Sequence, residues 1–90
     1  MTRQEIEQEV KSILQREFEI ENPAMDDNLR EVYGFDSIDA IELLLEIENL
    51  LGSELTQEEK KQAMDIRTIN QICEYIEKIA QTRAAAPASK

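Results

Sequence analysis

The apolar run from Ile38 to Leu51 constrains the fold of this chain more than any other segment. On a helical wheel at about 100° per residue, one set of its apolar side chains falls within an arc of roughly 120°. This inner set is Ala40, Leu43, Leu44, Ile47, Leu50 and Leu51. A second set lies along a line that is displaced from the inner set by roughly 150° around the helix. This second set, called the outer stripe, is Ile38, Ile41 and Leu45. One helix packed on one side cannot bury both sets, so the run predicts either a central helix or an exposed apolar line.

Capping boxes mark the starts of three further helices. In each box, a Thr is followed three residues later by a Glu or Gln that can bond back to the cap. The boxes are "TRQE", "TQEE" and "TINQ", which begin at Thr2, Thr56 and Thr68. With the apolar spacing that follows the first and third boxes, the sequence predicts helices over residues 3–17 and 68–81. The second box by itself predicts a short helix over residues 56–64.

Another helix is expected from Asp36 or Ser37, both good N-caps, to Leu51, with Gly52 beyond its end. The segment before it, residues 21–35, has no sustained period and is typical of a long loop. One turn is expected within 27–32. Connections of this length in compact domains are often functional.

The fold class follows from these elements. Met25, Leu29 and Val32 are predicted to attach the long first loop to the core. No two-residue alternation indicates a strand, so an all-α domain is expected. It would be a small bundle of four helices, three longer ones and a short third one.

Charge and composition narrow the function classes. The chain has 90 residues, 20 acidic and 10 basic, with no His and a net charge of −10. This excess disfavours nucleic acid and anionic membranes and favours basic protein partners. Cys73 is the only cysteine, which excludes an internal disulfide and a Cys-based zinc site. No metal site is expected. We predict a monomeric, cytoplasmic domain over residues 1–81 and a disordered tail over 82–90.

Ser37 stands beside Asp36 at the mouth of the apolar run. A catalytic serine needs an adjacent base, and the nearest basic residues in sequence are Arg30 and Lys60. There is no G-x-S-x-G elbow either. Two interpretations remain: Ser37 is a helix cap, or its hydroxyl is an attachment point. The second suits an exposed helix N-terminus, where the dipole and free N–H groups favour a phosphate.

The stretch "GFDSIDAIELLLEIE" resembles the G-x-D-S-[LI]-D-x-x-E-L signature of the acyl carrier protein family. The matching residues are Gly34, Asp36, Ser37, Ile38, Asp39, Glu42 and Leu43. The wider resemblance in helix order and length covers about residues 3–80. It implies an antiparallel four-helix bundle that is not itself an enzyme. Such a protein carries an acyl chain as a thioester on a 4′-phosphopantetheine arm, here attached to Ser37, and shelters the chain between its helices.

The resemblance also implies roles for the residues around Ser37. Asp36 would hold the position of the serine and help bind the magnesium used by a phosphopantetheinyl transferase. Docking on basic surfaces of this transferase and of acyl-processing enzymes would involve Ile38, Asp39, Ile41, Glu42, Leu45 and Glu48. The chain departs from the family pattern at Tyr33 and at Asn49. The segment between Leu55 and Ile66 is also longer than usual, and Lys60 and Lys61 interrupt an acidic region there. These departures indicate a specialised or secondary carrier rather than the housekeeping one.

Other functions fit the same sequence. Fatty-acid and polyketide biosynthesis are both open, and "LLLEIE" also resembles D-alanyl or aminoacyl carriers. From a different class, the chain could be an unmodified acidic helical adaptor in which Ser37 is only a cap. An EF-hand is excluded, because "DDNLREVYGFDS" lacks the alternating oxygen ligands, the central glycine and the closing glutamate.

Overall fold

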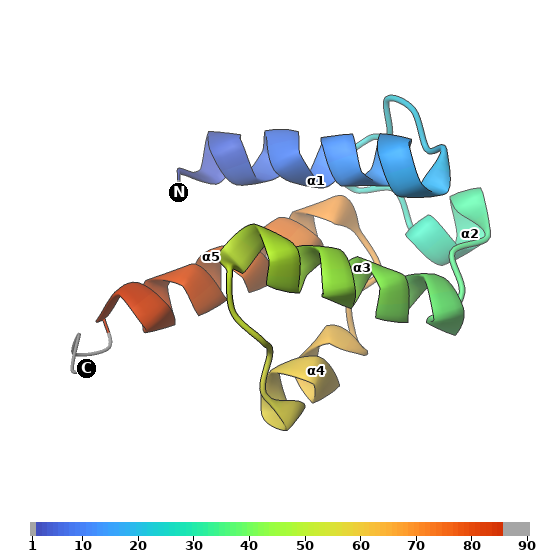
Figure 1. The fold of residues 1–90 in the computed structure, drawn as a ribbon. Helices are drawn as coiled ribbons and strands as arrows, with labels where there is room; N and C mark the ends of the chain where they lie inside the picture. Colours follow the sequence, from blue (N-terminus) through green and yellow to red (C-terminus); the bar gives the residue numbers. More distant parts are fainter. Residues whose placement is uncertain (1, 86–90) are drawn as a thin grey trace.

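A computed structural model describes residues 2–85, which form helices and contain no strand. The helices are α1 (Arg3–Phe18), α2 (Leu29–Tyr33), α3 (Ser37–Leu51), α4 (Gln57–Ala63) and α5 (Ile69–Ala85). In Figure 1, α1 runs opposite to α3 and α5, while α4 lies on the far side of α3 from α1. The predicted all-α class and small helical bundle are confirmed.

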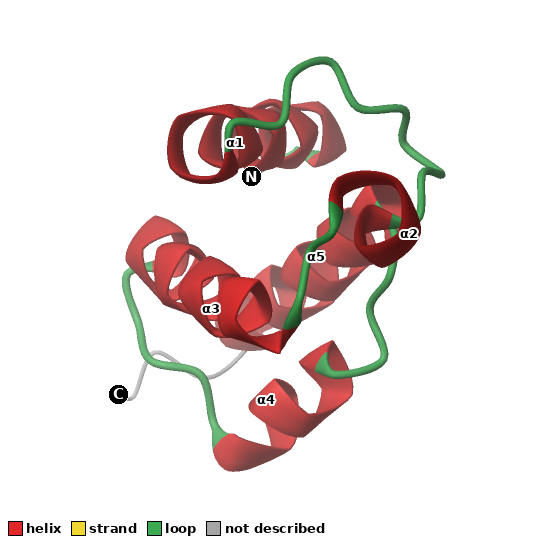
Figure 2. Ribbon diagram, turned by 90° about the vertical axis from the view of Figure 1, so that its right-hand side faces the viewer, coloured by secondary structure: helices red, strands yellow, loops and turns green. Residues whose placement is uncertain are grey.

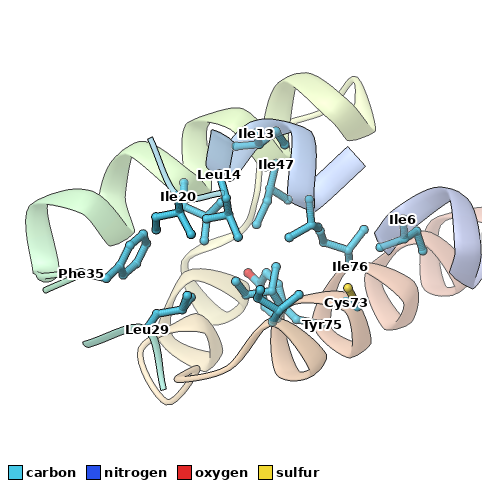
Figure 3. Close-up of a cluster of buried hydrophobic side chains, with 14 of the residues drawn as sticks. Ile6, Ile13, Leu14, Ile20, Leu29, Phe35, Ile47, Cys73, Tyr75 and Ile76 are labelled. Atoms are coloured by element: carbon cyan, nitrogen blue, oxygen red, sulfur yellow. The ribbon is translucent and has the colours of Figure 1, made fainter. Parts of the chain in front are cut away.

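One apolar face of each long helix fills the core, as Figure 3 shows. The buried side chains of the three long helices are Ile6, Val10, Ile13, Leu14, Leu43, Ile47, Ile69, Ile72, Cys73, Tyr75, Ile76 and Ile79. The rest of the inner set of α3 packs half-buried against this core. Aliphatic side chains therefore supply most of the packing, with Phe18 and Phe35 in edge-to-face contact at 5.3 Å between ring centroids.

The three predicted capping boxes all form. The Oγ1 atoms of Thr2, Thr56 and Thr68 accept hydrogen bonds from the backbone N–H three residues later, at 3.1, 3.1 and 3.2 Å. The reciprocal bonds from each Thr backbone N–H to the Glu or Gln side chain are also present. Because both partners bond, each helix start predicted from a box lies within one residue of the observed one.

The long first loop contains a helix of its own. Asn28 caps α2 by accepting hydrogen bonds from the N–H groups of Arg30 and Glu31. Leu29 is buried and Met25 half-buried, as expected. Val32 is 55% exposed, so the prediction that it faces the core is wrong. The helical turn rotates Val32 away from the side that Leu29 buries.

The last helix is longer than predicted. It continues to Ala85, so the assignment of a disordered tail from residue 82 onward is wrong for residues 82–85. Residues 86–90 of the predicted tail lie outside the described residues. Contacts of Arg83 with the segment between α3 and α4 hold the added turn in place. No helix in the described part of the chain combines the length and apolarity needed to cross a bilayer.

Candidate functional site

Asp36, rather than Ser37, is the N-cap of α3. Its Oδ1 atom accepts a hydrogen bond from the N–H of Asp39 at 3.0 Å, and the N–H of Asp36 donates to Asp39 Oδ2 at 3.1 Å. These two hydrogen bonds form a capping box that was not predicted from the sequence. The third residue after the cap is Asp39, whereas the usual motif has Glu or Gln at that position. Ser37 is the first helical residue, so a capping role does not explain its hydroxyl.

Ser37 is exposed at the first turn of α3. Among residues 2–85, its hydroxyl and the backbone N–H groups of Ser37 and Ile38 have no hydrogen-bond partner. Free N–H groups at a helix start carry partial positive charge and bind phosphate oxygens. The site therefore offers an accessible hydroxyl beside donors that suit a phosphate ester.

The segment between α2 and α3 places Ser37 at the surface. Gly34 ends α2 with φ of 67°, the left-handed conformation that glycine adopts without strain. Phe35 is buried, and its N–H donates to the carbonyl oxygen of Leu29 at 3.1 Å. With Phe35 anchored against the core, Asp36 and Ser37 follow directly at the rim.

The outer stripe faces solvent along α3. Ile38, Ile41 and Leu45 are 70%, 60% and 55% exposed, whereas Leu43 and Ile47 on the opposite side are buried. This result decides between the two interpretations of the apolar run, because a central helix with both sets buried is excluded. The outer stripe begins one residue after Ser37, so an apolar line leads away from the exposed hydroxyl.

The charged residues predicted around the site differ in their surroundings. Glu42 is exposed and borders an acidic hollow of about 230 Å³ between α1 and the start of α3. Asp39 is committed to the capping box. Glu48 is half-buried, and its Oε2 accepts a hydrogen bond from the N–H of Leu55 at 2.8 Å. Of these carboxylates, only Glu42 is both exposed and free of such a structural bond.

The described residues supply no base for the Ser37 hydroxyl. The chain has no His, and no side chain among residues 2–85 is hydrogen-bonded to this oxygen. The remaining strong nucleophile, Cys73, is buried, and burial raises its pKa to about 11. Its thiol stays protonated and unreactive at neutral pH. The arrangement can present a hydroxyl to another enzyme but does not activate it.

A small apolar cavity lies behind the start of α3. Its volume is about 30 Å³, and α2, α3, α4 and α5 all contribute to its walls. The lining includes Leu29, Leu44, Ala63, Met64 and Ile72, and every residue in it has an apolar side chain. An apolar space of this kind suits a hydrocarbon group.

Comparison with protein families accounts for the exposed serine. Residues 8–76 match the family described as "Phosphopantetheine attachment site". The chain belongs to this family. Domains of the phosphopantetheine attachment site family are carriers with a covalently attached 4′-phosphopantetheine prosthetic group. No solved structure gave a match to the chain. The family inferred from the sequence is thus confirmed, and the exposed hydroxyl and free N–H groups at the start of α3 fit a group joined through a phosphate ester.

Proposed function

We propose that this domain carries acyl chains as thioesters on a 4′-phosphopantetheine arm attached to Ser37. The observation that carries the proposal is the exposed hydroxyl at the first turn of α3, which Asp36 leaves free by taking the capping role. When bound, the arm supplies a terminal thiol that forms the thioester. Asp36 and Asp39 fix the helix start, so the hydroxyl is presented at a constant position to the modifying enzyme.

The cavity favours an acyl chain over the alternative of an aminoacyl group. Its lining from four helices is apolar, and burying an ammonium group there without a partner would be costly. The family match and the free serine likewise support a modified carrier rather than an unmodified adaptor. Fatty-acid, polyketide and related pathways all use acyl thioesters, so the proposal covers each of them.

Intact mass spectrometry tests the carrier function. The protein is incubated with coenzyme A, magnesium and a promiscuous phosphopantetheinyl transferase, with a matched reaction that lacks the transferase. We expect a gain of one phosphopantetheine in the complete reaction, and fragmentation should place it on the peptide that contains Ser37. An unchanged mass would overturn the carrier proposal, and a gain at another residue would overturn the assignment of Ser37.

The outer stripe and Glu42 are proposed as the docking surface for the transferase and for acyl-processing enzymes. An exposed apolar line supplies contact area, and the acidic border attracts a basic surface. No basic residue occurs between Arg30 and Lys60 in the sequence. The basic side chain of Arg16 from α1 pairs with Glu46 at 3.1 Å, so the charge along α3 is an acidic excess rather than a field of one sign. Asp39 and Glu48 contribute charge to this excess while their carboxylates hold the ends of α3 in place.

Replacing Glu42 with lysine is expected to slow association with a carrier-dependent enzyme by about 3–10-fold at low ionic strength, because the change reverses a charge at the docking surface. The difference from wild type should shrink as salt is added. Stopped-flow measurements over a salt series test this. Glu9→Lys makes the same charge change on an exposed position of α1 and should have a smaller effect. Equal effects of the two variants would argue against docking along α3.

A further inference from the structure

The apolar cavity is too small to shelter an acyl chain without a change in its walls. Its volume of about 30 Å³ is close to the share of one molecule in liquid water, which is about 30 Å³. Protein interiors are close-packed, so further space must come from the displacement of a wall. The inference developed from this point rests on the proposed acyl-carrier function.

Helix α4 is the wall with the weakest anchorage in the core. No residue of α4 is buried, whereas Leu29 of α2, Leu43 of α3 and Ile72 of α5 are buried at the cavity. The C-terminal end of α4 reaches the cavity through Ala63 and Met64. Figure 2 shows α4 on the outside of the bundle, joined to α3 and α5 through extended loops. Its displacement would disturb less buried apolar surface than a shift of α3 or α5.

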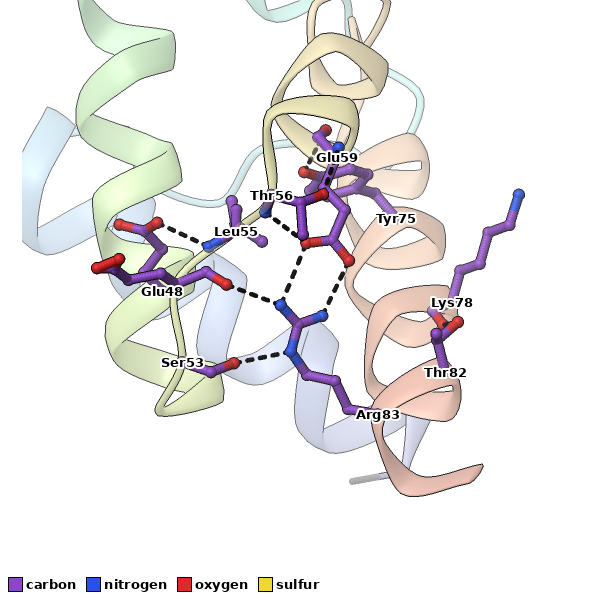
Figure 4. A network of polar contacts seen from close by, with 10 residues as sticks. Glu48, Ser53, Leu55, Thr56, Glu59, Tyr75, Lys78, Thr82 and Arg83 are labelled. Carbon is purple, nitrogen blue, oxygen red and sulfur yellow. Dashed lines mark hydrogen bonds and ion pairs between the residues drawn. The ribbon is translucent and has the colours of Figure 1, made fainter. Parts of the chain in front are cut away.

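The opposite end of α4 is held by one arginine of α5, as Figure 4 shows. Arg83 Nη1 and Nη2 donate to the two carboxylate oxygens of Glu59 at 3.0 and 3.1 Å. Its Nη2 also donates to the carbonyl oxygen of Glu54 at 2.8 Å, and its Nε donates to Ser53 Oγ at 2.7 Å. A single guanidinium thus joins α5 to the first turn of α4 and to the loop before it.

The pairing of Arg83 with Glu59 is of the strong kind. Two parallel charged hydrogen bonds fix both the distance and the orientation of the carboxylate. The hydrogen bond from Arg83 lowers the pKa of Glu59, so this carboxyl stays ionised at neutral pH. The buried Tyr75 adds a second bond from α5, because its hydroxyl donates to the carbonyl oxygen of Glu59 at 2.6 Å. Helix α4 therefore has an N-terminal end fixed to α5. Within residues 2–85, no such bond joins its C-terminal end to α5, and at that end the carbonyl oxygen of Met64 accepts from Arg67 Nη1 in the following loop at 2.8 Å.

We propose that Arg83 is a positioning residue that restricts how far α4 can move from the cavity and so limits the length of the acyl chain that the carrier shelters. With the first turn of α4 joined to α5, movement takes place at the end that carries Ala63 and Met64. Loss of the Arg83 bonds would leave only the bond from Tyr75 at this end, so α4 could move further and the cavity could deepen.

Hydrogen exchange of the unmodified protein tests the connection that Arg83 and Glu59 make between α5 and α4, which is called the joint. Arg83→Gln removes the charged pair, while Lys78→Gln removes one positive charge from the same helix at an exposed side chain. We expect the amides of α4 to exchange about tenfold faster in Arg83→Gln and at the wild-type rate in Lys78→Gln. Unchanged exchange of α4 in Arg83→Gln would overturn the proposal.

A second variant reaches the same joint from the other side. Glu59→Gln removes the ionised partner but keeps the capping box, because Gln also serves as its third residue. The amides of α4 should again exchange faster. This variant keeps the proposal testable if Arg83→Gln does not fold, and wild-type exchange in Glu59→Gln would then overturn it.

The length limit is tested on loaded protein. Wild type, Arg83→Gln and Lys78→Gln are each loaded with phosphopantetheine arms that carry saturated acyl groups of increasing length. The Tm of each acylated protein is then measured. We expect the gain in Tm to level off at a longer chain in Arg83→Gln than in wild type or Lys78→Gln. The same limiting length in all three would overturn the inference while leaving the carrier function intact. Failure of wild type to accept the arm would instead overturn the proposed function.

Discussion

Replacing Ser37 with alanine is expected to abolish loading of phosphopantetheine. After incubation with coenzyme A, magnesium and a transferase, wild type should gain the mass of one group, and Ser37→Ala should remain at its unmodified mass. The loss should be complete rather than partial, because alanine offers no oxygen for the phosphodiester. Intact mass spectrometry over a time course checks this result.

The structure makes this substitution a clean one. Ser37 is exposed and is not the N-cap, so Asp36 and Asp39 still hold the start of α3 in the variant. Alanine is also favourable within a helix. Its effect on the free energy of unfolding should lie within about 0.5 kcal/mol. Ser12→Ala, at an exposed position of α1, is the matched control and should load like wild type. A gain in mass by Ser37→Ala would refute the assignment.

The three long helices were predictable because each has two independent local signals, whereas α4, which buries no residue, had only its capping box. Apolar spacing identified the faces that became the core, and capping chemistry identified the starts. Both signals depend on residues three or four positions apart, so a single sequence contains them. The box formed by Asp36 and Asp39 lacked the usual Glu or Gln, and for this reason the sequence left the cap of α3 undecided between Asp36 and Ser37.

Contacts between distant residues could not be predicted in the same way. Arg83 was assigned to the tail because small and polar residues surround it in "TRAAAPASK". In the structure, its partners Ser53, Glu54 and Glu59 come from a loop and helix at least 24 positions earlier. No local spacing indicates such a pair. An arginine followed by alanines is nevertheless compatible with the last turn of a helix, and that signal could have extended α5.

The location and general role of the candidate site were predictable from the types of residue that compose it. A serine after an aspartate, before an acidic and apolar helix, indicated attachment and docking rather than catalysis. The sequence could not show which of the carboxylates are held in hydrogen bonds and which are free. On a wheel Glu42 and Glu48 both border the outer stripe, and Asp39 belongs to the same acidic segment. Hydrogen bonds with backbone N–H groups nevertheless give Asp39 and Glu48 structural roles. Mutation of Asp39 or Glu48 would change both the docking surface and the hydrogen bonds at the ends of α3. Mutation of Glu42 therefore tests docking more directly.

The division of α3 into an inner set and an outer stripe predicts unequal costs of truncation. Leu43→Ala is expected to reduce the free energy of unfolding by about 2–5 kcal/mol, because Leu43 is 5% exposed and its removal enlarges a cavity. Ile41→Ala, at an exposed position of the same helix, should change it by about 0.5 kcal/mol or less. Urea denaturation monitored by circular dichroism measures both values.

The effects of the same two variants on binding should be in the opposite order, with the larger loss of affinity in Ile41→Ala. Ile41→Ala removes part of the proposed docking surface and should weaken association with a carrier-dependent enzyme, while its fold is retained. Leu43→Ala leaves the outer stripe in place, so the folded fraction of this variant should associate as wild type does. Equal losses of stability for the two variants would mean that α3 buries both of its apolar sets in solution. An exposed docking line beside Ser37 requires the losses to differ, because only side chains that solvent already reaches can be truncated without opening the core.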